Sequence, residues 1–158
     1  MKFLLCFFLL LTFFSCSKED AVSPSGKQIL GIWFQEDSLP EDNRISKLQY
    51  HFKEDNTLEI LRIELDANSR QVLGYRYRST ARFSLVKDQL SFSDFTNYIH
   101  NDSLGSYSSL QDLKAATPQL NGYIVTCKLE DKGRKLTFIY PPCKDTFNCI
   151  GAQTFSKE

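Results

Sequence analysis

The feature that most constrains the fold is an alternation of apolar and polar residues with a period of two. It is clearest between Tyr75 and Leu85, where every second residue is apolar or small and the residues between them are arginine, threonine or serine. Successive side chains of a β-strand point to opposite faces, so this pattern predicts a strand with one buried and one wet face. The predicted buried face consists of Tyr75, Tyr77, Ser79, Ala81, Phe83 and Leu85.

Similar strand signals recur along the chain, and turn-forming residues separate several of them. The predicted strands are 31–35, 47–53, 57–65, 74–85, 89–95, 122–130, 135–140 and 148–155. Asp, Asn and Gly residues between neighbouring strands favour tight connections, which indicates an antiparallel meander. The apolar phase switches between Ile60 and Leu61, which predicts a β-bulge there. One short helix is predicted at 109–116, from the capping-box spacing of Ser109 and Asp112 and from Pro118 beyond it.

The expected fold class is therefore all-β, an up-and-down meander of about eight strands. Such a meander must close into a barrel or fold into a sandwich, because an open sheet leaves unpaired backbone groups at its edges. The chain has 158 residues with thirteen Phe and seven Tyr, enough apolar surface for one core. Nineteen basic residues balance nineteen acidic ones, which gives no overall field that favours nucleic acid.

The N-terminal segment has the pattern of an export signal. Lys2 precedes an apolar run from Phe3 to Phe14, which is shorter than the roughly 20 residues of a transmembrane helix. The stretch Phe-Phe-Ser-Cys at 13–16 resembles a bacterial lipobox, in which the cysteine receives a diacylglyceryl group before cleavage. The resemblance implies a signal peptide at 1–15 and a Cys16 that carries acyl chains such as palmitate. An ordinary signal with an incidental cysteine is the alternative.

The residues after Cys16 contain a possible localisation signal and a predicted linker. Ser17-Lys18-Glu19-Asp20 resembles the signal that sends Bacteroidota lipoproteins to the outer face of the outer membrane; a plain polar linker is the alternative. Residues 16–28 are polar and turn-prone, which predicts a flexible tether between the lipid anchor and a domain at 29–158. The expected location is the outer membrane, lipid-anchored and facing the cell exterior.

The start of the predicted domain carries a second resemblance. Leu30-Gly31-Ile32-Trp33 resembles the Gly-x-Trp signature of lipocalins, and the spacing of Tyr50, Phe52 and Leu58 is similar to that of lipocalin-like domains of Bacteroidota lipoproteins. The resemblance covers roughly residues 29–158 and implies a distant calycin-type barrel. In such barrels the tryptophan closes the narrow end and a basic side chain packs across it, for which Lys157 is the candidate. A plain core aromatic is the alternative role for Trp33.

Residues suited to catalysis are scarce. The two histidines, His51 and His100, are both expected at the surface, because alternation turns His51 outward and His100 stands in a turn-like stretch. We find no zinc motif, phosphate-binding glycine loop or nucleophile elbow, and the adjacent acidic pairs lie in expected turns or strand ends. We therefore predict a protein without catalytic activity, metal or cofactor.

The aromatic residues of the predicted inner face are the candidate ligand-binding residues. They would either fill a barrel or leave an apolar cavity. The sequence thus favours a binding module for a small apolar or amphipathic ligand; the alternative is an interaction or assembly subunit of an outer-membrane complex. The arginines at 70, 76, 78 and 82 are expected on a solvated strand face, or else in a basic stripe for anionic glycans or phosphates. The candidate ligand-binding residues are Tyr50, Phe52, Tyr75, Tyr77, Phe83 and Phe92.

Three cysteines remain beside Cys16 once the leader is removed. Export favours oxidation, and three thiols permit one internal disulfide. We predict a disulfide between Cys143 and Cys149, which flank a short connection, and a reduced Cys127 inside the sheet. A bridge from Cys127 to one of the other two is the alternative, because the strands that carry them could lie side by side in a closed barrel.

Overall fold

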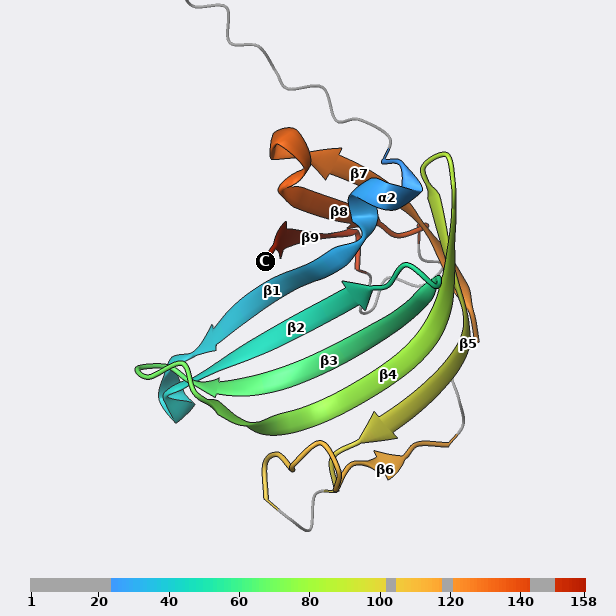
Figure 1. The fold of residues 1–158 in the computed structure, drawn as a ribbon. Coiled ribbons are helices and arrows are strands. Elements are labelled where there is room, and N and C mark those ends of the chain that lie inside the picture. The colour runs from blue at the N-terminus through green and yellow to red at the C-terminus, as the bar shows by residue number, and fades with distance from the viewer. Residues whose placement is uncertain (1–23, 102–104, 118–120, 143–149) are drawn as a thin grey trace, which may run out of the picture.

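The structure of the chain, a computed structural model, describes residues 24–101, 105–117, 121–142 and 150–158. These residues form an antiparallel barrel of eight strands, in which each strand pairs with the next and the last returns to the first (Figure 1). The predicted all-β meander and its closure into a barrel are confirmed. The eight strands are β1 (Gly31–Leu39), β2 (Arg44–Phe52), β3 (Thr57–Asp66), β4 (Val72–Val86), β5 (Gln89–Ile99), β7 (Tyr123–Glu130), β8 (Lys135–Ile139) and β9 (Ala152–Lys157).

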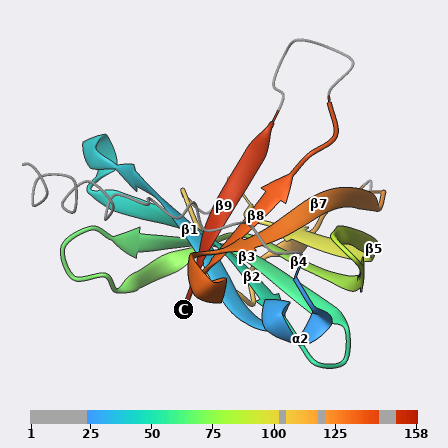
Figure 2. The same ribbon diagram turned by 90° about the horizontal axis from the view of Figure 1, so that it is seen from above.

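Short elements complete the described chain. A two-residue strand, β6 (Lys114–Ala115), pairs with the far end of β5, and the helical turns are α2 (Gly26–Ile29), η1 (Pro40–Asp42) and η3 (Asp131–Gly133). Pro24 is buried, and α2 lies at one end of the barrel (Figures 1 and 2), where Gly26 and Lys27 line a pocket with Glu54 and Asn56 of the β2–β3 turn.

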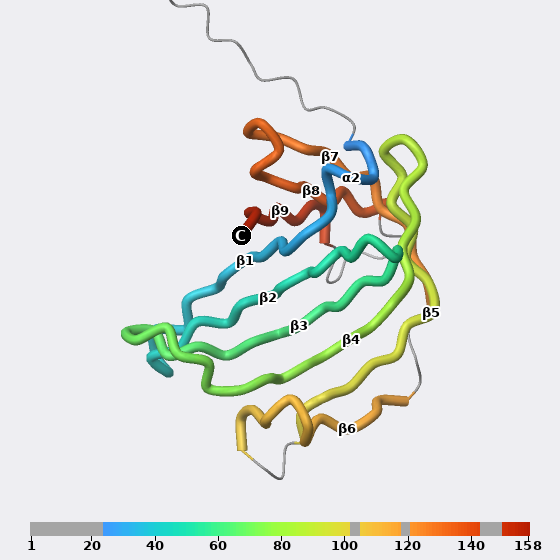
Figure 3. Tube along the Cα trace, in the orientation of Figure 1, coloured from blue at the N-terminus to red at the C-terminus, as the bar shows by residue number. Residues whose placement is uncertain are grey.

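The strands pair over unequal lengths. β1 and β2 pair along their whole length, whereas β1 meets β9 only at Trp33 and Phe34, and β5 meets β7 only between Gln89 and Phe92. Long curved strands β2 to β5 therefore sweep past the shorter strands β7 to β9 (Figure 3). The barrel thus has a closed end near α2 and a second end formed by the far halves of β1 to β4.

Aromatic side chains fill the closed end. Trp33, Phe52, Phe92, Phe138 and Phe155 are buried, and Phe138 packs on Phe155 with ring centroids 5.0 Å apart. The Trp33 indole N–H donates to the Ile29 carbonyl at 2.7 Å, and the Lys157 ammonium lies 5.0 Å from the indole centroid. This is the basic contact across the tryptophan that the lipocalin resemblance implied. We call the five buried rings the aromatic plug.

The helix predicted at 109–116 is wrong. Ser109 and Asp112 do form the capping contact, since the Ser109 hydroxyl donates to the Asp112 carboxylate at 2.7 Å, but it closes a single turn. Lys114 and Ala115 then pair with Tyr98 and Ile99 of β5. A helix of two turns is marginal by itself, and the backbone edge of β5 beyond β7 offers hydrogen bonds that the helix would forgo.

The β-bulge predicted at Ile60 and Leu61 is also misplaced. β2 and β3 pair without interruption from Arg44 opposite Asp66 to Phe52 opposite Leu58. The register shifts lie instead between β3 and β4, after Arg62 and after Glu64. Every second residue of β3 therefore faces inward along the whole strand. The inward residues change along it from apolar to polar.

Candidate functional site

The structure brings four of the six predicted ligand-binding residues together in the barrel core. Tyr50, Phe52, Phe83 and Phe92 are buried, with Phe52 and Phe83 in edge contact at a centroid separation of 4.9 Å. Tyr77 is partly buried against the same cluster. Tyr75 lies beyond the register shift, where its backbone pairs with Ser108. These rings pack on one another and form much of the core.

A layer of tyrosines follows the plug. Tyr50, Tyr123 and Tyr140 lie near one another, with the Tyr123 and Tyr140 ring centroids 6.4 Å apart, and the Tyr140 hydroxyl donates to Gln153 Oε1 at 2.7 Å. Burial, more than any other cause, raises the pKa of each of the three phenols above its ordinary value. They stay neutral at physiological pH, so this layer offers hydroxyl groups without charge.

A second polar contact spans β4 and β5. Tyr77 Oη and Ser79 Oγ both donate to Asn97 Oδ1, at 2.8 and 2.7 Å. Ser79 lies directly opposite Asn97 in the strand pairing, so the sheet itself sets this geometry. On the side of the plug that faces the second end of the barrel, the interior therefore carries amide and hydroxyl groups that hydrogen-bond to one another.

The far end of the interior carries charged side chains. Ser46 and Glu64 lie opposite each other on β2 and β3, in phase with Tyr50 and Ile60, and thus face inward. The Glu64 side chain is 0% exposed and accepts a hydrogen bond from the Ser46 hydroxyl at 3.1 Å. Arg62 Nη1 donates to the same hydroxyl at 3.2 Å, and Arg44 Nη1 lies 3.6 Å from Glu64 Oε2. We call Arg44, Ser46, Arg62 and Glu64 the polar end.

Segment 105–108 lies against the polar end. The Arg44 guanidinium is 5.9 Å from the centroid of the Tyr107 ring. Gly74, opposite Glu64 in the pairing of β3 with β4, allows this approach, because a Cβ on residue 74 would lie 2.7 Å from Tyr107 Cδ2. Tyr107 therefore closes the polar end on the side of β4.

His100 helps to hold this segment, and its predicted exposure is wrong. Its side chain is 8% exposed, and its two ring nitrogens contact Ser108 Oγ and the Gly105 carbonyl. Segment 105–108 lies against the ring and covers it.

Three buried polar atoms lack a hydrogen-bond partner among the described residues. They are Gln35 Oε1, Arg44 Nη1 and Glu64 Oε2. The separation of 3.6 Å between Arg44 and Glu64 is an ion-pair distance, too long for a good hydrogen bond. An unmet buried polar atom costs about 1–3 kcal/mol, so groups of this kind call for a ligand or water that completes them.

The sequence analysis did not predict the polar end, although the residue pattern of β3 contains a signal for it. In β3 the inward residues pass from Leu58 and Ile60 to Arg62 and Glu64, while the apolar residues move to the outer face. A change of apolar phase without a break in pairing marks the point where the interior turns polar. The predicted bulge rests on this same pattern.

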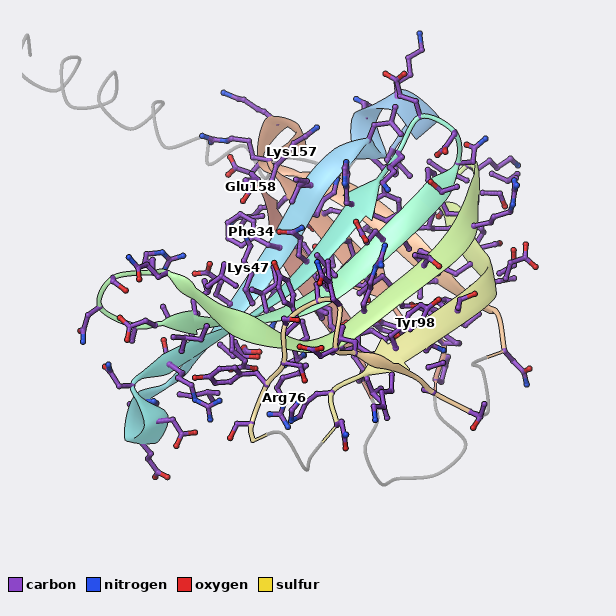
Figure 4. The ribbon with its side chains drawn as sticks, turned by 60° about the horizontal axis from the view of Figure 1, so that its bottom comes forward. Phe34, Lys47, Arg76, Tyr98, Lys157 and Glu158 are labelled. Atoms are coloured by element: carbon purple, nitrogen blue, oxygen red, sulfur yellow. The ribbon has the colours of Figure 1, made fainter. Side chains whose placement is uncertain are left out.

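The outer surface carries two further features. Ile124, which is 54% exposed, lines a groove of about 450 Å³ with Ile139, Pro141 and Pro142. On β1 and β2, Lys47 lies 4.5 Å from the Phe34 ring centroid and pairs with Glu158 at 2.8 Å (Figure 4).

The arginines predicted on the outer face of β4 lie on a solvated surface. Arg78 pairs with Glu59 at 2.9 Å, and Arg76 and Arg82 are exposed. Arg70, in the β3–β4 turn, pairs with Glu36 at 2.6 Å. The outward position of these side chains follows from the alternation that places Tyr77 and Phe83 inside.

Of the sequence-predicted cysteines, the structure describes one. Cys127 is a free, buried thiol in β7, and burial raises its pKa to about 11. Cys16, Cys143 and Cys149 lie outside the described residues, so lipidation and the proposed disulfide stay predictions.

Within the described part of the chain, no three His, Cys, Asp or Glu side chains gather as metal ligands would, and no helix is long and apolar enough to cross a membrane. Comparisons with protein-family models, with curated proteins and with solved structures find no match.

Proposed function

We propose that this protein is a lipid-anchored binding module without catalytic activity, displayed on the outer face of the outer membrane, whose barrel binds a small amphipathic ligand at its polar end. The observation that carries the binding proposal is the fully buried Glu64, whose Oε2 faces Arg44 Nη1 while neither atom has a hydrogen-bond partner among the described residues. Burial of charged groups is costly, so their presence inside a barrel favours a binding role.

The barrel interior suits an amphipathic ligand better than a wholly apolar one. The plug already fills the closed end with aromatic rings, and the tyrosine layer and the polar end present hydroxyl, amide and charged groups. A ligand with one polar head would meet these groups first, with its remainder against Tyr77 and the neighbouring rings.

We also propose that the domain is a distant lipocalin-like barrel of the calycin type. The closed meander of eight strands supports this proposal, together with the buried Trp33 and the Lys157 ammonium that lies over its indole. Gly31, just before this tryptophan in the signature, has a φ of 107° and marks the bend into β1.

Retention of a small molecule tests the binding proposal. The mature protein would be purified natively from its own bacterium, and denaturant-released small molecules and bound proteins would both be identified by mass spectrometry. We expect a stoichiometric small molecule. A stoichiometric protein partner, with no small molecule, would contradict the proposal.

The anchor is tested separately. Metabolic labelling with an alkyne analogue of palmitate should label the wild-type protein, and Cys16→Ala should abolish the label. Protease added to intact cells should digest the wild-type protein, because it faces the exterior. A labelled C16A variant would exclude Cys16 as the sole acylated residue.

A protein-interaction role is the second candidate, favoured by the groove between Ile124 and Pro141. Ile124, Pro141 and Pro142 are exposed around one groove, and apolar residues that adjoin one another on a surface are typical of interaction sites. Ile124→Glu should then abolish capture of a partner and leave the melting temperature unchanged.

A further inference from the structure

The unpartnered atoms of the polar end define the chemistry of the group that would complete them. Arg44 Nη1 is a donor, and Glu64 Oε2 is an acceptor 3.6 Å away. Gln35 Oε1, on the neighbouring strand β1 and in phase with Trp33, is a second buried acceptor without a partner among the described residues. The completing group must therefore accept one hydrogen bond and donate at least one.

The charges of the polar end argue against a charged group. Arg44 pairs with Glu64 and with the more exposed Asp42, which accepts a hydrogen bond from Arg44 Nη2, and Arg62 donates to Ser46 Oγ, so two cations and two anions balance at this end. An added anion or cation would stand unpaired in this buried position, and an unpaired buried charge is strongly unfavourable.

We propose that the polar end is a recognition site for a neutral hydroxyl-bearing group, such as a sugar or polyol head. A hydroxyl both donates and accepts, so one hydroxyl can receive a hydrogen bond from Arg44 Nη1 and donate to Glu64 Oε2. A second hydroxyl of the same head donates to Gln35 Oε1. Hydrogen bonds to charged groups are the stronger kind, which gives the head its selectivity. This inference rests on the proposed function and names the ligand class.

The experiment titrates the folded Cys16→Ala domain with n-octyl glucoside below its micelle concentration, followed by NMR of backbone and side-chain signals. We expect the resonances of Gln35, Arg44 and Glu64 to move. Glu64→Gln should weaken binding by about tenfold or more, because a carboxylate acceptor is lost.

Glu59→Gln is the matched control. Glu59 lies on β3, as Glu64 does, and pairs with Arg78 on the outer face of the barrel. Its replacement by Gln removes the same negative charge. It should leave the affinity for octyl glucoside unchanged. Equal affinities in E64Q and E59Q would overturn the proposal.

Gln35→Met keeps the inference testable if E64Q does not fold. Met has a similar volume but removes an acceptor that has no partner in the described structure, so the ligand-free domain should be as stable as the wild type or more stable. Binding of octyl glucoside should nevertheless weaken. If Gln35 had only a structural role, its replacement would not weaken binding while stability is kept. An affinity of Q35M for octyl glucoside equal to that of the wild type would therefore contradict the proposed site.

Two probes with the same chain and charged heads separate this inference from the proposed function. If octyl phosphate or octylammonium moves the polar-end resonances and octyl glucoside does not, the neutral-hydroxyl proposal is wrong and the binding function stands. If none of the three probes binds and no small molecule co-purifies, both proposals fail.

Discussion

Buried polar side chains carry most of the functional information at the scale of single residues. Glu64 is fully enclosed, yet its partners Ser46 and Arg44 satisfy only one of its two carboxylate oxygens by a hydrogen bond. Replacement of a buried ion pair by apolar residues is often neutral or stabilising, so a barrel selected for stability alone has little reason to keep one. The aromatic plug shows the opposite case, in which rings pack against other apolar side chains and leave no polar group unmet.

Cys127 should be chemically inert in the folded domain. It is buried in β7, and burial raises its pKa to about 11, so little thiolate is present near neutral pH. In a variant that carries Cys143→Ser and Cys149→Ser, a thiol reagent should react slowly with the native domain at about pH 8 and quickly after denaturation. Rapid reaction in the native state would contradict the buried position.

At the scale of elements, β4 and segment 105–108 depend on one small residue. Tyr75 and Ser108 exchange two backbone hydrogen bonds, of 2.8 and 3.0 Å, and Gly74 lets Tyr107 approach the strand beside them. The whole arrangement places Tyr107 over Arg44.

Gly74→Ala should detach this segment. The added methyl would lie 2.7 Å from Tyr107 Cδ2 and 2.8 Å from the Ser108 carbonyl, so the segment or β4 must shift. We expect a loss of about 1–3 kcal/mol in the free energy of unfolding, with faster hydrogen exchange at the amides of Tyr75 and Ser108. Gly151→Ala is the control, because no described atom lies within 4 Å of the position that its added methyl would take. Equal stability of the two variants would rule out the tight contact.

The seam between β1 and β9 should depend on the last two residues. Glu158 N donates to the Ile32 carbonyl of β1, and Lys157 N donates on the other side of β9 to the Arg134 carbonyl just before β8, while the two side chains contact Trp33 and Lys47. Deletion of both residues should lower the free energy of unfolding by about 2–4 kcal/mol. Glu158→Gln, which keeps the backbone, should cost less than about 1 kcal/mol. A deletion no worse than E158Q would show that the seam does not depend on these bonds.

At the scale of the whole molecule, the strands and their closure could be predicted from alternation, because one apolar face repeats along most of the chain. The sequence could not exclude a helix at 109–116, because the structure that replaces it is a pairing with the edge of β5, which a local pattern does not reveal. The polar end was missed for a related reason. The inward phase of β3 is defined by its pairing with β2, and a single strand whose apolar phase switches is compatible with a bulge or with a change of interior.

The tyrosine layer couples the stability of the entire barrel to alkaline pH. Burial raises the pKa of Tyr50, Tyr123 and Tyr140 above the ordinary value of about 10, which the unfolded chain retains. Below about pH 10 both states keep these protons and stability is unaffected by them. Above it the unfolded state loses protons that the native state holds, so the native state is progressively disfavoured, by up to about 1.4 kcal/mol per pH unit for each phenol.

Urea unfolding as a function of pH measures this coupling. The free energy of unfolding should decline above about pH 10, and the ultraviolet signal of these phenolates should appear with unfolding and not before it. Tyr50→Phe keeps the ring contacts with Phe138 and Phe155 but removes one buried hydroxyl, so its decline should be shallower. If Y50F and the wild type decline with the same slope, the Tyr50 hydroxyl is not held neutral by the barrel.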